Sequence, residues 1–204
     1  MTGGAAVVVP AVRAELARKA LHLASAALPI ALSVGAISLP ALRVLLAVAT
    51  LVALSVEIAR HTMPAVQRRF VAGVGSMLRP HEHGAITGAT WLAVALLGAA
   101  LLLPAHPAIV AMWAAAMGDG LASLVGRLAS KRVSRDAGQK TWAGSVTCLV
   151  VTAAGAWWLV AAPIGAALLV GAAAAAAERP RIALDDNLRV AAAAGLAAWA
   201  LLPA

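Results

Sequence analysis

The sequence predicts an all-α polytopic membrane protein, a helical bundle of about seven transmembrane spans. Of its 204 residues, 63% are hydrophobic and 12% are charged, and the mean hydropathy is +0.92. A soluble domain carries about 25% charged residues, so an ordinary soluble fold is excluded. Several apolar stretches approach the roughly 20 residues that a helix needs to cross a bilayer. We therefore expect residues 1–204 to form a single integral membrane domain.

The expected elements are apolar runs separated by polar or proline-containing breaks. Pro40, Pro104, Pro107 and Pro163 lie in or beside the short connections, where proline interrupts helices. The predicted spans are residues 20–38, 41–59, 85–103, 108–127, 143–162, 163–177 and 188–203. The first ten residues have no basic segment before their short apolar run, so we do not interpret them as a cleaved signal peptide.

The placement of Lys and Arg predicts the orientation in the membrane. The segments on the side of the N-terminus are 1–19, 60–83, 127–141 and 178–189. They hold 3, 4, 5 and 3 Lys or Arg residues, which is 15 of the 16 in the chain. Because cytoplasmic loops are enriched in these residues, segment 1–19 is expected in the cytoplasm, beneath a bacterial-type inner membrane. The net charge of +8 then reflects topology, and nucleic acid is not an expected partner.

The acidic residues also lie on or near the cytoplasmic side. The positive-inside rule concerns Lys and Arg and does not explain them. An active site that faces the cytoplasm would explain both distributions. The eight acids are Glu15, Glu57, Glu82, Asp119, Asp136, Glu178, Asp185 and Asp186.

Asp119 is the most informative acid because it lies inside the apolar run 109–126. A charge at membrane depth costs at least roughly 2.5–3.5 kcal/mol on insertion scales, and such residues usually mark functional sites. On a helix, Asp119, Ser123 and Arg127 share one face. The alternative is that Asp119 forms a structural ion pair with Arg127 or Lys140.

A small-residue ridge follows a neighbouring stripe of the same predicted helix. Gly118, Ala122 and Gly126 recur at intervals of four residues. For these residues alone, close helix packing is the favoured interpretation.

The basic loop after Asp119 and the start of the next span suit a phosphate. Mg²⁺ binds one or two carboxylates together with water and substrate phosphates. Arginine contacts phosphate in bidentate fashion, and helix N-termini attract anions. No P-loop pattern surrounds Lys140. The candidate phosphate-binding residues are Arg127, Lys131, Arg132, Lys140, Thr141, Gly144 and Ser145.

A second polar constellation precedes the last predicted span, within residues 178–189. Asp185, Asp186 and Asn187 are consecutive. Paired carboxylates with a carboxamide suit a metal, a ribose or a hydroxyl nucleophile. The alternative is that Asp186 or Asn187 caps the last helix.

A third constellation lies at the entrance to the first span. Glu15, Arg18, Lys19 and His22 have the spacing of a single helical face. The alternative is a Glu–Lys pair on a segment that carries inside-positive charge.

Two weaker signals lie between the second and third spans. Segment 60–83 is partly amphipathic, so it is either a helix along the membrane surface or a linker. His81, Glu82 and His83 are interpreted as a polar loop, and the residues from Thr87 to Thr90 as helix-packing residues.

The three constellations together resemble the CTP-dependent lipid kinases, which comprise dolichol kinase, phytol kinase and the CTP-type diacylglycerol kinases. The matching elements are residues 15–22, residues 118–127 followed by 140–145, and residues 185–188. They occur in the family's order and cover most of the chain. Ser130 and Thr141 depart from the residues that family members often have there. The resemblance implies phosphoryl transfer from CTP, with Mg²⁺, to phytol, farnesol, geranylgeraniol, a polyprenol or diacylglycerol.

The resemblance also implies roles for residues of this chain. The catalytic set would be Asp119, Lys140, Asp185 and Asp186, with Asp119 and Asp186 as metal ligands and either Asp185 or Asp186 activating the hydroxyl. Arg127 and Lys140 would hold the triphosphate with help from Lys131 and Arg132, while Asn187 would orient nucleotide or metal. Glu15, Arg18, Lys19 and His22 would line the entrance.

Two other functions stay open from the sequence. One is transfer of CMP to a lipid phosphate, as in phosphatidate cytidylyltransferases. The other is a transporter or scaffold without enzymatic activity. The identity of the lipid and the oligomeric state are not predicted.

Overall fold

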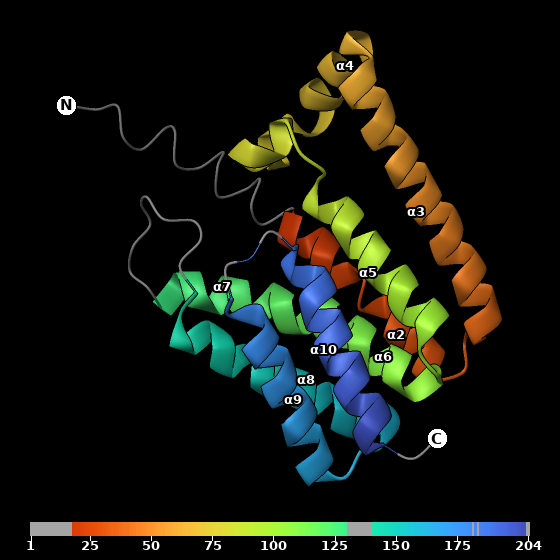
Figure 1. The fold of residues 1–204 in the computed structure, drawn as a ribbon, viewed down its shortest axis with the longest axis vertical. Helices are drawn as coiled ribbons and strands as arrows, with labels where there is room; N and C mark the ends of the chain where they lie inside the picture. Colours follow the sequence, from red (N-terminus) through yellow and green to blue (C-terminus); the bar gives the residue numbers. More distant parts are fainter. Residues whose placement is uncertain (1–17, 130–139, 181, 183, 203–204) are drawn as a thin grey trace.

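The structure, a computed structural model, is all-helical over the residues it describes, which are 18–129, 140–180, 182 and 184–202 (Figure 1). Residues 18–24 form a first helical segment. The elements that follow are α2 (Ala27–Ser33), α3 (Leu39–Thr62), α4 (Pro64–Val74), η1 (Gly75–Met77), η2 (Pro80–His83), α5 (Gly88–Leu102), α6 (Ala105–Trp113), η3 (Ala114–Asp119), α7 (Gly120–Ala129), α8 (Trp142–Val160), α9 (Ile164–Glu178) and α10 (Asp186–Leu201). All-α architecture is thereby confirmed for the described residues.

Helix starts follow local capping rules. The side chains of Thr87, Thr141 and Asp185 each accept a hydrogen bond from a backbone N–H two or three residues further on, at the starts of α5, α8 and α10. These are residue types that satisfy the free N–H groups of a first turn. Proline occupies the first turn of α3 and α4, where its missing N–H carries no penalty.

Three helices in the described part of the chain are long and apolar enough to cross a membrane, judged by length and composition. They are α3, the continuous helix Ala105–Ala129 that comprises α6, η3 and α7, and α8. The helices α5 and α9 are apolar but shorter. Each of the seven predicted spans lies over helical residues. The first predicted span is divided into two helical pieces.

The predicted span 20–38 is two short helical pieces with a turn at Ser25 and Ala26 between them. Pro29 gives the physical reason. It has no N–H to donate to the Ser25 carbonyl, and its ring crowds that carbonyl in a regular helix. Leu28 N–H donates to the Ser25 carbonyl instead, at 3.1 Å. A continuous 19-residue helix was therefore the wrong expectation for this segment.

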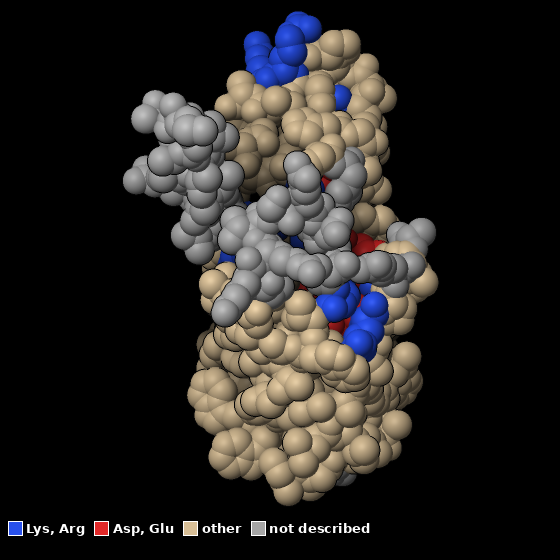
Figure 2. All heavy atoms as spheres, turned by 90° about the vertical axis from the view of Figure 1, so that its left-hand side faces the viewer, with Lys and Arg blue, Asp and Glu red and all other residues tan. Residues whose placement is uncertain are grey.

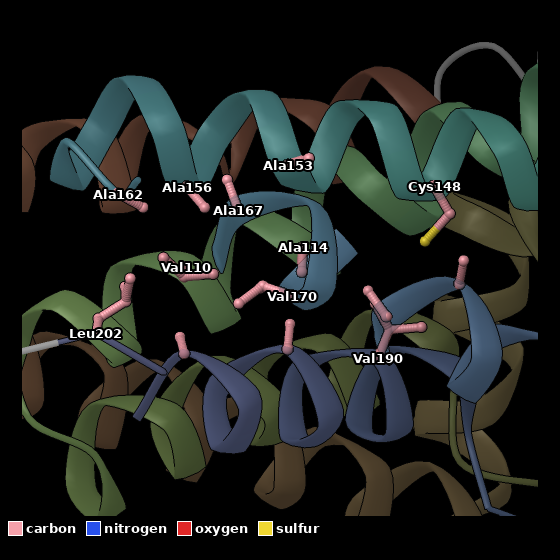
Figure 3. Packing of buried hydrophobic residues seen from close by; sticks show 14 of the residues in the cluster. Val110, Ala114, Cys148, Ala153, Ala156, Ala162, Ala167, Val170, Val190 and Leu202 are labelled. Atoms are coloured by element: carbon pink, nitrogen blue, oxygen red, sulfur yellow. The ribbon is translucent and has the colours of Figure 1, made fainter. Parts of the chain in front are cut away.

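The main core is built from alanine and other small residues of α6, α8, α9 and α10 (Figure 3). The close-up shows Ala156, Ala167 and Val170 pointing into the same layer between helices. Gly171 allows α9 to approach the backbone of α8 closely, because a Cβ there would lie 2.4 Å from the Leu149 carbonyl oxygen. Small side chains let helix backbones approach in this way.

The helix α3 packs on α5 and lies along one edge of the molecule (Figure 1). Leu42 and Leu46 are buried on its inner face, whereas Val48, Leu51 and Val52 are exposed. A continuous apolar stripe on a helix of this length is typical of a surface that meets lipid.

Candidate functional site

The candidate site starts with a local irregularity around Asp119. Residues Ala114–Asp119 form a π-helical turn inside the long helix Ala105–Ala129. Such turns often occur at functional sites, because they place side chains where a regular helix would not. Asp119 ends this turn and is only 7% exposed. Lys19, His22 and Lys140 interact electrostatically with its carboxylate, while the bonds of the Lys140 ammonium go to Glu178 and Asp186.

The segment 18–24 packs against this turn. His22 Nε2 lies 2.9 Å from the Ala115 carbonyl oxygen. A Cβ on Gly120 would lie 2.9 Å from Leu23 Cδ2 and 3.1 Å from His22 Cδ2, so the absence of a side chain at Gly120 permits this contact. His22 also interacts electrostatically with Asp119. The predicted entrance residue His22 therefore lies beside the helical turn that carries Asp119.

Lys19 lies buried at the same place, with 5% exposure. Burial lowers the pKa of Lys19 to about 8. The Asp119 carboxylate opposes this shift, and the positive charges of Arg18, Arg79 and Arg127 add to it. Lys19 therefore interacts with Asp119 and with arginines from three separate segments of the chain.

Lys140 connects the start of α8 to two other helices. Its Nζ lies 2.6 Å from Asp186 Oδ2 and 2.8 Å from Glu178 Oε1. Ser145 Oγ donates to the other Glu178 oxygen at 3.2 Å. Burial opposes protonation of Lys140, yet the hydrogen bonds that its ammonium donates to Asp186 and Glu178 outweigh this effect and raise the pKa of the lysine.

The start of α10 carries the second predicted constellation. Asp185 Oδ1 accepts hydrogen bonds from Asn187 N and Asn187 Nδ2, both at 2.9 Å. The helix cap is therefore Asp185, and not Asp186 or Asn187 as in the alternative interpretation. Asp186 bonds through its Oδ1 to Arg189 Nη2 and through its Oδ2 to Lys140.

The side-chain amide oxygen of Asn187, Oδ1, is buried without a hydrogen-bond partner among the described residues. The residue as a whole is 6% exposed. Its Nδ2 is held by Asp185, which turns Oδ1 the other way. A buried acceptor left in this state costs roughly 1–3 kcal/mol, so an external donor or cation would be favoured there.

Electrostatics join these pieces into one site. Burial raises the pKa of Asp185; the hydrogen bonds from Asn187 oppose the shift, while the charges of Asp186 and Asp119 add to it. The negative charge of Asp119 also contributes to the raised pKa of Lys140. Figure 2 shows acidic and basic atoms gathered at mid-height, above a lower body whose surface is almost free of charge.

An aromatic contact forms part of the rim of this site. The guanidinium of Arg179 lies 3.8 Å from the ring centroid of Trp142, which is 74% exposed. A cation over a Trp face is an attractive arrangement. Trp142 is the first residue of the candidate span Trp142–Val160.

A separate buried polar cluster links α3 to α5, and the sequence analysis did not identify it. Arg60 Nε donates to Glu57 Oε2 at 2.6 Å, and Glu57 Oε1 accepts from Thr87 Oγ1 at 2.7 Å and Thr90 Oγ1 at 3.0 Å. Glu82 accepts at 3.0 Å from the N–H of Gly88. The threonines expected to pack helices therefore bind a buried carboxylate.

The donor set was tested against Mg²⁺. No group of three or more His, Cys, Asp or Glu side chains in the described residues is arranged as a complete metal cage. Mg²⁺ does not need one, because it binds one or two carboxylates with water and substrate phosphates. Asp119 fits this role because it supplies one buried carboxylate. Asp186, the other predicted ligand, has both oxygens bonded to cations.

Other predicted residues have structural contacts of their own. Gly144 allows close packing, since a Cβ there would lie 2.9 Å from the Ala122 carbonyl oxygen. Gly126 and Thr141 meet at the same crossing. Arg127 Nε donates to the Ser123 carbonyl at 3.2 Å. Glu15, Lys131 and Arg132 lie outside the described residues.

Three residues join the site although no role was predicted for them. Glu178 and Arg189 hold Lys140 and Asp186, and Arg79 acts electrostatically on Lys19. The signal for Glu178 and Arg189 was present, because both lie within the constellation 178–189. Arg79 has no such signal, because only folding brings its loop near Lys19.

No family model, curated protein or solved structure matches this chain.

Proposed function

We propose that this protein is an integral membrane enzyme that transfers the γ-phosphoryl group of CTP to a membrane lipid alcohol with the help of Mg²⁺. The carrying observation is Asp119, a buried carboxylate that interacts electrostatically with the buried ammonium of Lys19. Metal-assisted phosphoryl transfer requires such an acid together with positive charge around the phosphates. The choice of CTP and of a lipid alcohol rests on the resemblance in motif order.

The proposed topology has seven spans, the N-terminus in the cytoplasm and the site facing the cytoplasm of a bacterial-type inner membrane. The basic segments would then lie beside anionic headgroups and the nucleotide. The lipid tail would lie among the apolar helices, so that its hydroxyl meets the phosphate at the inner interface.

The proposed chemistry is an in-line displacement. The lipid hydroxyl oxygen bonds to the γ-phosphorus, the bond from that phosphorus to the β–γ bridging oxygen breaks, and CDP leaves. Asp185 is the better candidate to accept the hydroxyl proton, because both oxygens of Asp186 are bonded to Lys140 and Arg189. Lys19 and Arg127 would neutralise phosphate oxygens. Bound Mg²⁺ would supply further charge neutralisation.

The test uses membranes that contain the protein and CTP labelled at either the α- or the γ-phosphate. The acceptor panel comprises the alcohols phytol, farnesol, geranylgeraniol, a polyprenol and diacylglycerol, together with phosphatidic acid as the lipid phosphate. A kinase transfers only the γ label to lipid. Transfer of the α label to a lipid phosphate, with release of pyrophosphate, identifies a cytidylyltransferase instead. No labelled lipid with any acceptor refutes both enzymes and supports a transporter or scaffold.

Asp119→Asn should abolish label transfer while the protein still inserts and folds, because the amide keeps the volume and removes the charge. Label transfer and thermal unfolding in detergent are the two measurements. Ser123→Ala, on the same face of the same helix, is the matched control and should retain activity. Full activity of Asp119→Asn would refute the metal role.

A further inference from the structure

We propose that Glu178 is the positioning residue that holds the Lys140 ammonium in place for a phosphate oxygen, and that Ser145 orients Glu178 in turn. The inference rests on the proposed function for the phosphate that Lys140 binds. It gives a role to Glu178, for which the sequence predicted none, and it changes the role expected for Ser145 from phosphate contact to support of Glu178. Lys140 contacts two acids, and these differ in helix position, in exposure and in their other partners.

Three helix ends meet at Lys140. The residue precedes α8, and its Nζ lies 2.8 Å from Glu178, the last residue of α9, and 2.6 Å from Asp186, the first residue of α10. The helix α9 packs along both α8 and α10 (Figure 1). Because packed helices fix the places of their ends, both acids are held in place relative to the start of α8.

Glu178 occupies a position that is unfavourable for an acid. At the end of α9 the negative end of the helix dipole opposes a carboxylate. Its side chain is only 3% exposed, so little water solvates the charge. Within the described residues, its bonded partners are the Lys140 ammonium and the Ser145 hydroxyl. Removal of Lys140 would leave a buried charge without a compensating cation, so this bond is strongly retained.

Asp186 depends less on Lys140. It lies in the first turn of α10, where the helix dipole favours an acid, and its side chain is 37% exposed. Its other oxygen bonds to Arg189. Asp186 therefore keeps a cation and a favourable position without Lys140. Of the two contacts of the ammonium, the one with Glu178 holds it more strongly.

Ser145 fixes which oxygen of Glu178 faces the lysine. It lies in the first turn of α8 and is 6% exposed. Its Oγ donates to Glu178 Oε2 at 3.2 Å, whereas Oε1 is the oxygen next to Lys140. A hydroxyl has one donor hydrogen, so Ser145 cannot also donate to a phosphate oxygen while this bond exists.

Lys140 keeps a donor for a ligand. An ammonium has three N–H groups, and the bonds to Asp186 and Glu178 use two of them. The lysine side chain is 22% exposed, so an anion can reach it. Since the N–H groups of an ammonium are tetrahedral, fixing two of them also fixes the direction of the third. Glu178 thereby influences where a phosphate oxygen binds.

The experiment compares two replacements of Glu178 that are similar in volume, on the full chain in detergent. Both remove the negative charge, but Glu178→Gln keeps an oxygen acceptor for Lys140 and Glu178→Met does not. Isothermal titration calorimetry measures the Kd for Mg²⁺-pyrophosphate. Glu178→Gln should bind it at least as tightly as the wild type, because one negative charge near the anion is gone. Glu178→Met should raise the Kd at least about fivefold, because Lys140 loses its orientation.

Glu57→Gln is the matched control. Glu57 is a buried acid of the separate cluster between α3 and α5. Its replacement should lower the free energy of unfolding and leave the Kd for pyrophosphate unchanged, as expected for a purely structural acid. In the γ-label assay, the KM for CTP should be higher in Glu178→Met than in Glu178→Gln.

Unchanged or tighter pyrophosphate binding in Glu178→Met overturns the inference, because Glu178 would then act through its charge alone. Absence of pyrophosphate binding in the wild type overturns it as well, and γ-label transfer then decides the kinase separately. If Glu178→Met does not fold, Glu178→Asp takes its place. This variant keeps the charge, withdraws the acceptor by one methylene, and should raise the Kd at least about threefold. A difference between the Met and Gln variants without γ-label transfer would refute the kinase and keep the positioning role.

Discussion

At the scale of single residues, Lys140 illustrates how one cation can organise the end of a bundle. Its ammonium bonds to Glu178 at the end of α9 and to Asp186 at the start of α10. Glu178 is only 3% exposed, and its second oxygen receives a hydrogen bond from Ser145. Lys140 therefore has a structural task besides the phosphate contact proposed for it.

Removal of Lys140 should consequently cost stability. Lys140→Ala leaves Glu178 buried with only the Ser145 hydroxyl, and breaking a buried pair typically costs about 3–5 kcal/mol. The free energy of unfolding in detergent measures this loss. The double variant Lys140→Met with Glu178→Met should recover most of it, because apolar residues can replace a buried pair. Arg68→Ala, on an exposed part of α4, should cost less than about 1 kcal/mol. A loss of equal size in Arg68→Ala would contradict the specific role of this pair.

Lys19 should give the activity an alkaline limit. Its pKa, lowered by burial to about 8, means that the ammonium is charged below this pH and neutral above it. Phosphate binding needs the charged form, so kcat/KM for CTP should fall as the pH rises through about 8. Lys19→Arg keeps the charge and should move this fall to higher pH. An unchanged pH profile in Lys19→Arg would exclude Lys19 as its cause.

At the scale of elements, helix contacts depend on positions without side chains. The helices α8 and α9 approach closely at Gly171, where a Cβ would lie 2.4 Å from a backbone oxygen of α8. Backbone cannot rotate away as a flexible side chain does. Gly165, in the same helix, has open space around it.

This contrast yields a matched pair of variants. Gly171→Ala should destabilise the protein by about 1–3 kcal/mol through overpacking. Gly165→Ala should be neutral or stabilising by up to about 1 kcal/mol, because alanine favours helix over glycine. Thermal unfolding in detergent compares the two. Equal effects at both positions would show that the α8–α9 contact does not limit stability.

The connection of α3 with α5 shows a second element-scale principle. Glu57 and Arg60 are buried near the end of an apolar helix, and both find partners in the segment that leads into α5. The carboxylates of Glu57 and Glu82 accept hydrogen bonds from the first backbone N–H groups of α5 and its cap. Negative charge at a helix N-terminus is favourable, so the protein itself supplies the acids there.

At the scale of the whole molecule, charge is gathered in one zone. Most charged residues border the site or α4, and the opposite end of the described chain is mainly apolar (Figure 2). This distribution agrees with a protein whose polar end meets the cytoplasm and whose remaining surface meets lipid.

The proposed orientation can be tested by thiol labelling. The sequence contains one cysteine, Cys148, so Cys148→Ala provides a background without cysteine. Added to it, Arg68→Cys on α4 should react with a membrane-impermeant reagent only in inverted vesicles. His106→Cys at the start of α6 should react only in right-side-out vesicles. The reverse pattern would invert the topology, and labelling of both from one side would refute the single span, residues 85–103, between them.

The sequence by itself determined the helices and their polar ends. Local rules suffice for this, because a helix begins at residues such as Thr87, Thr141 and Asp185 and follows an apolar run. At residues 20–38 an apolar run alone predicts one helix, but Pro29 divides it. The one-sided charge distribution and the order of the motifs also predicted that the three distant constellations belong together.

Only the tertiary structure decided which side chains pair. Lys140 meets Glu178 and Asp186, and Glu57 meets Thr87, across sequence separations that no local pattern encodes. Pairing depends on the register and rotation of packed helices, which are set by contacts such as Gly195 with Ala111. A shift of one residue turns a side chain about 100° around a helix, so consecutive Asp186 and Asn187 face different partners.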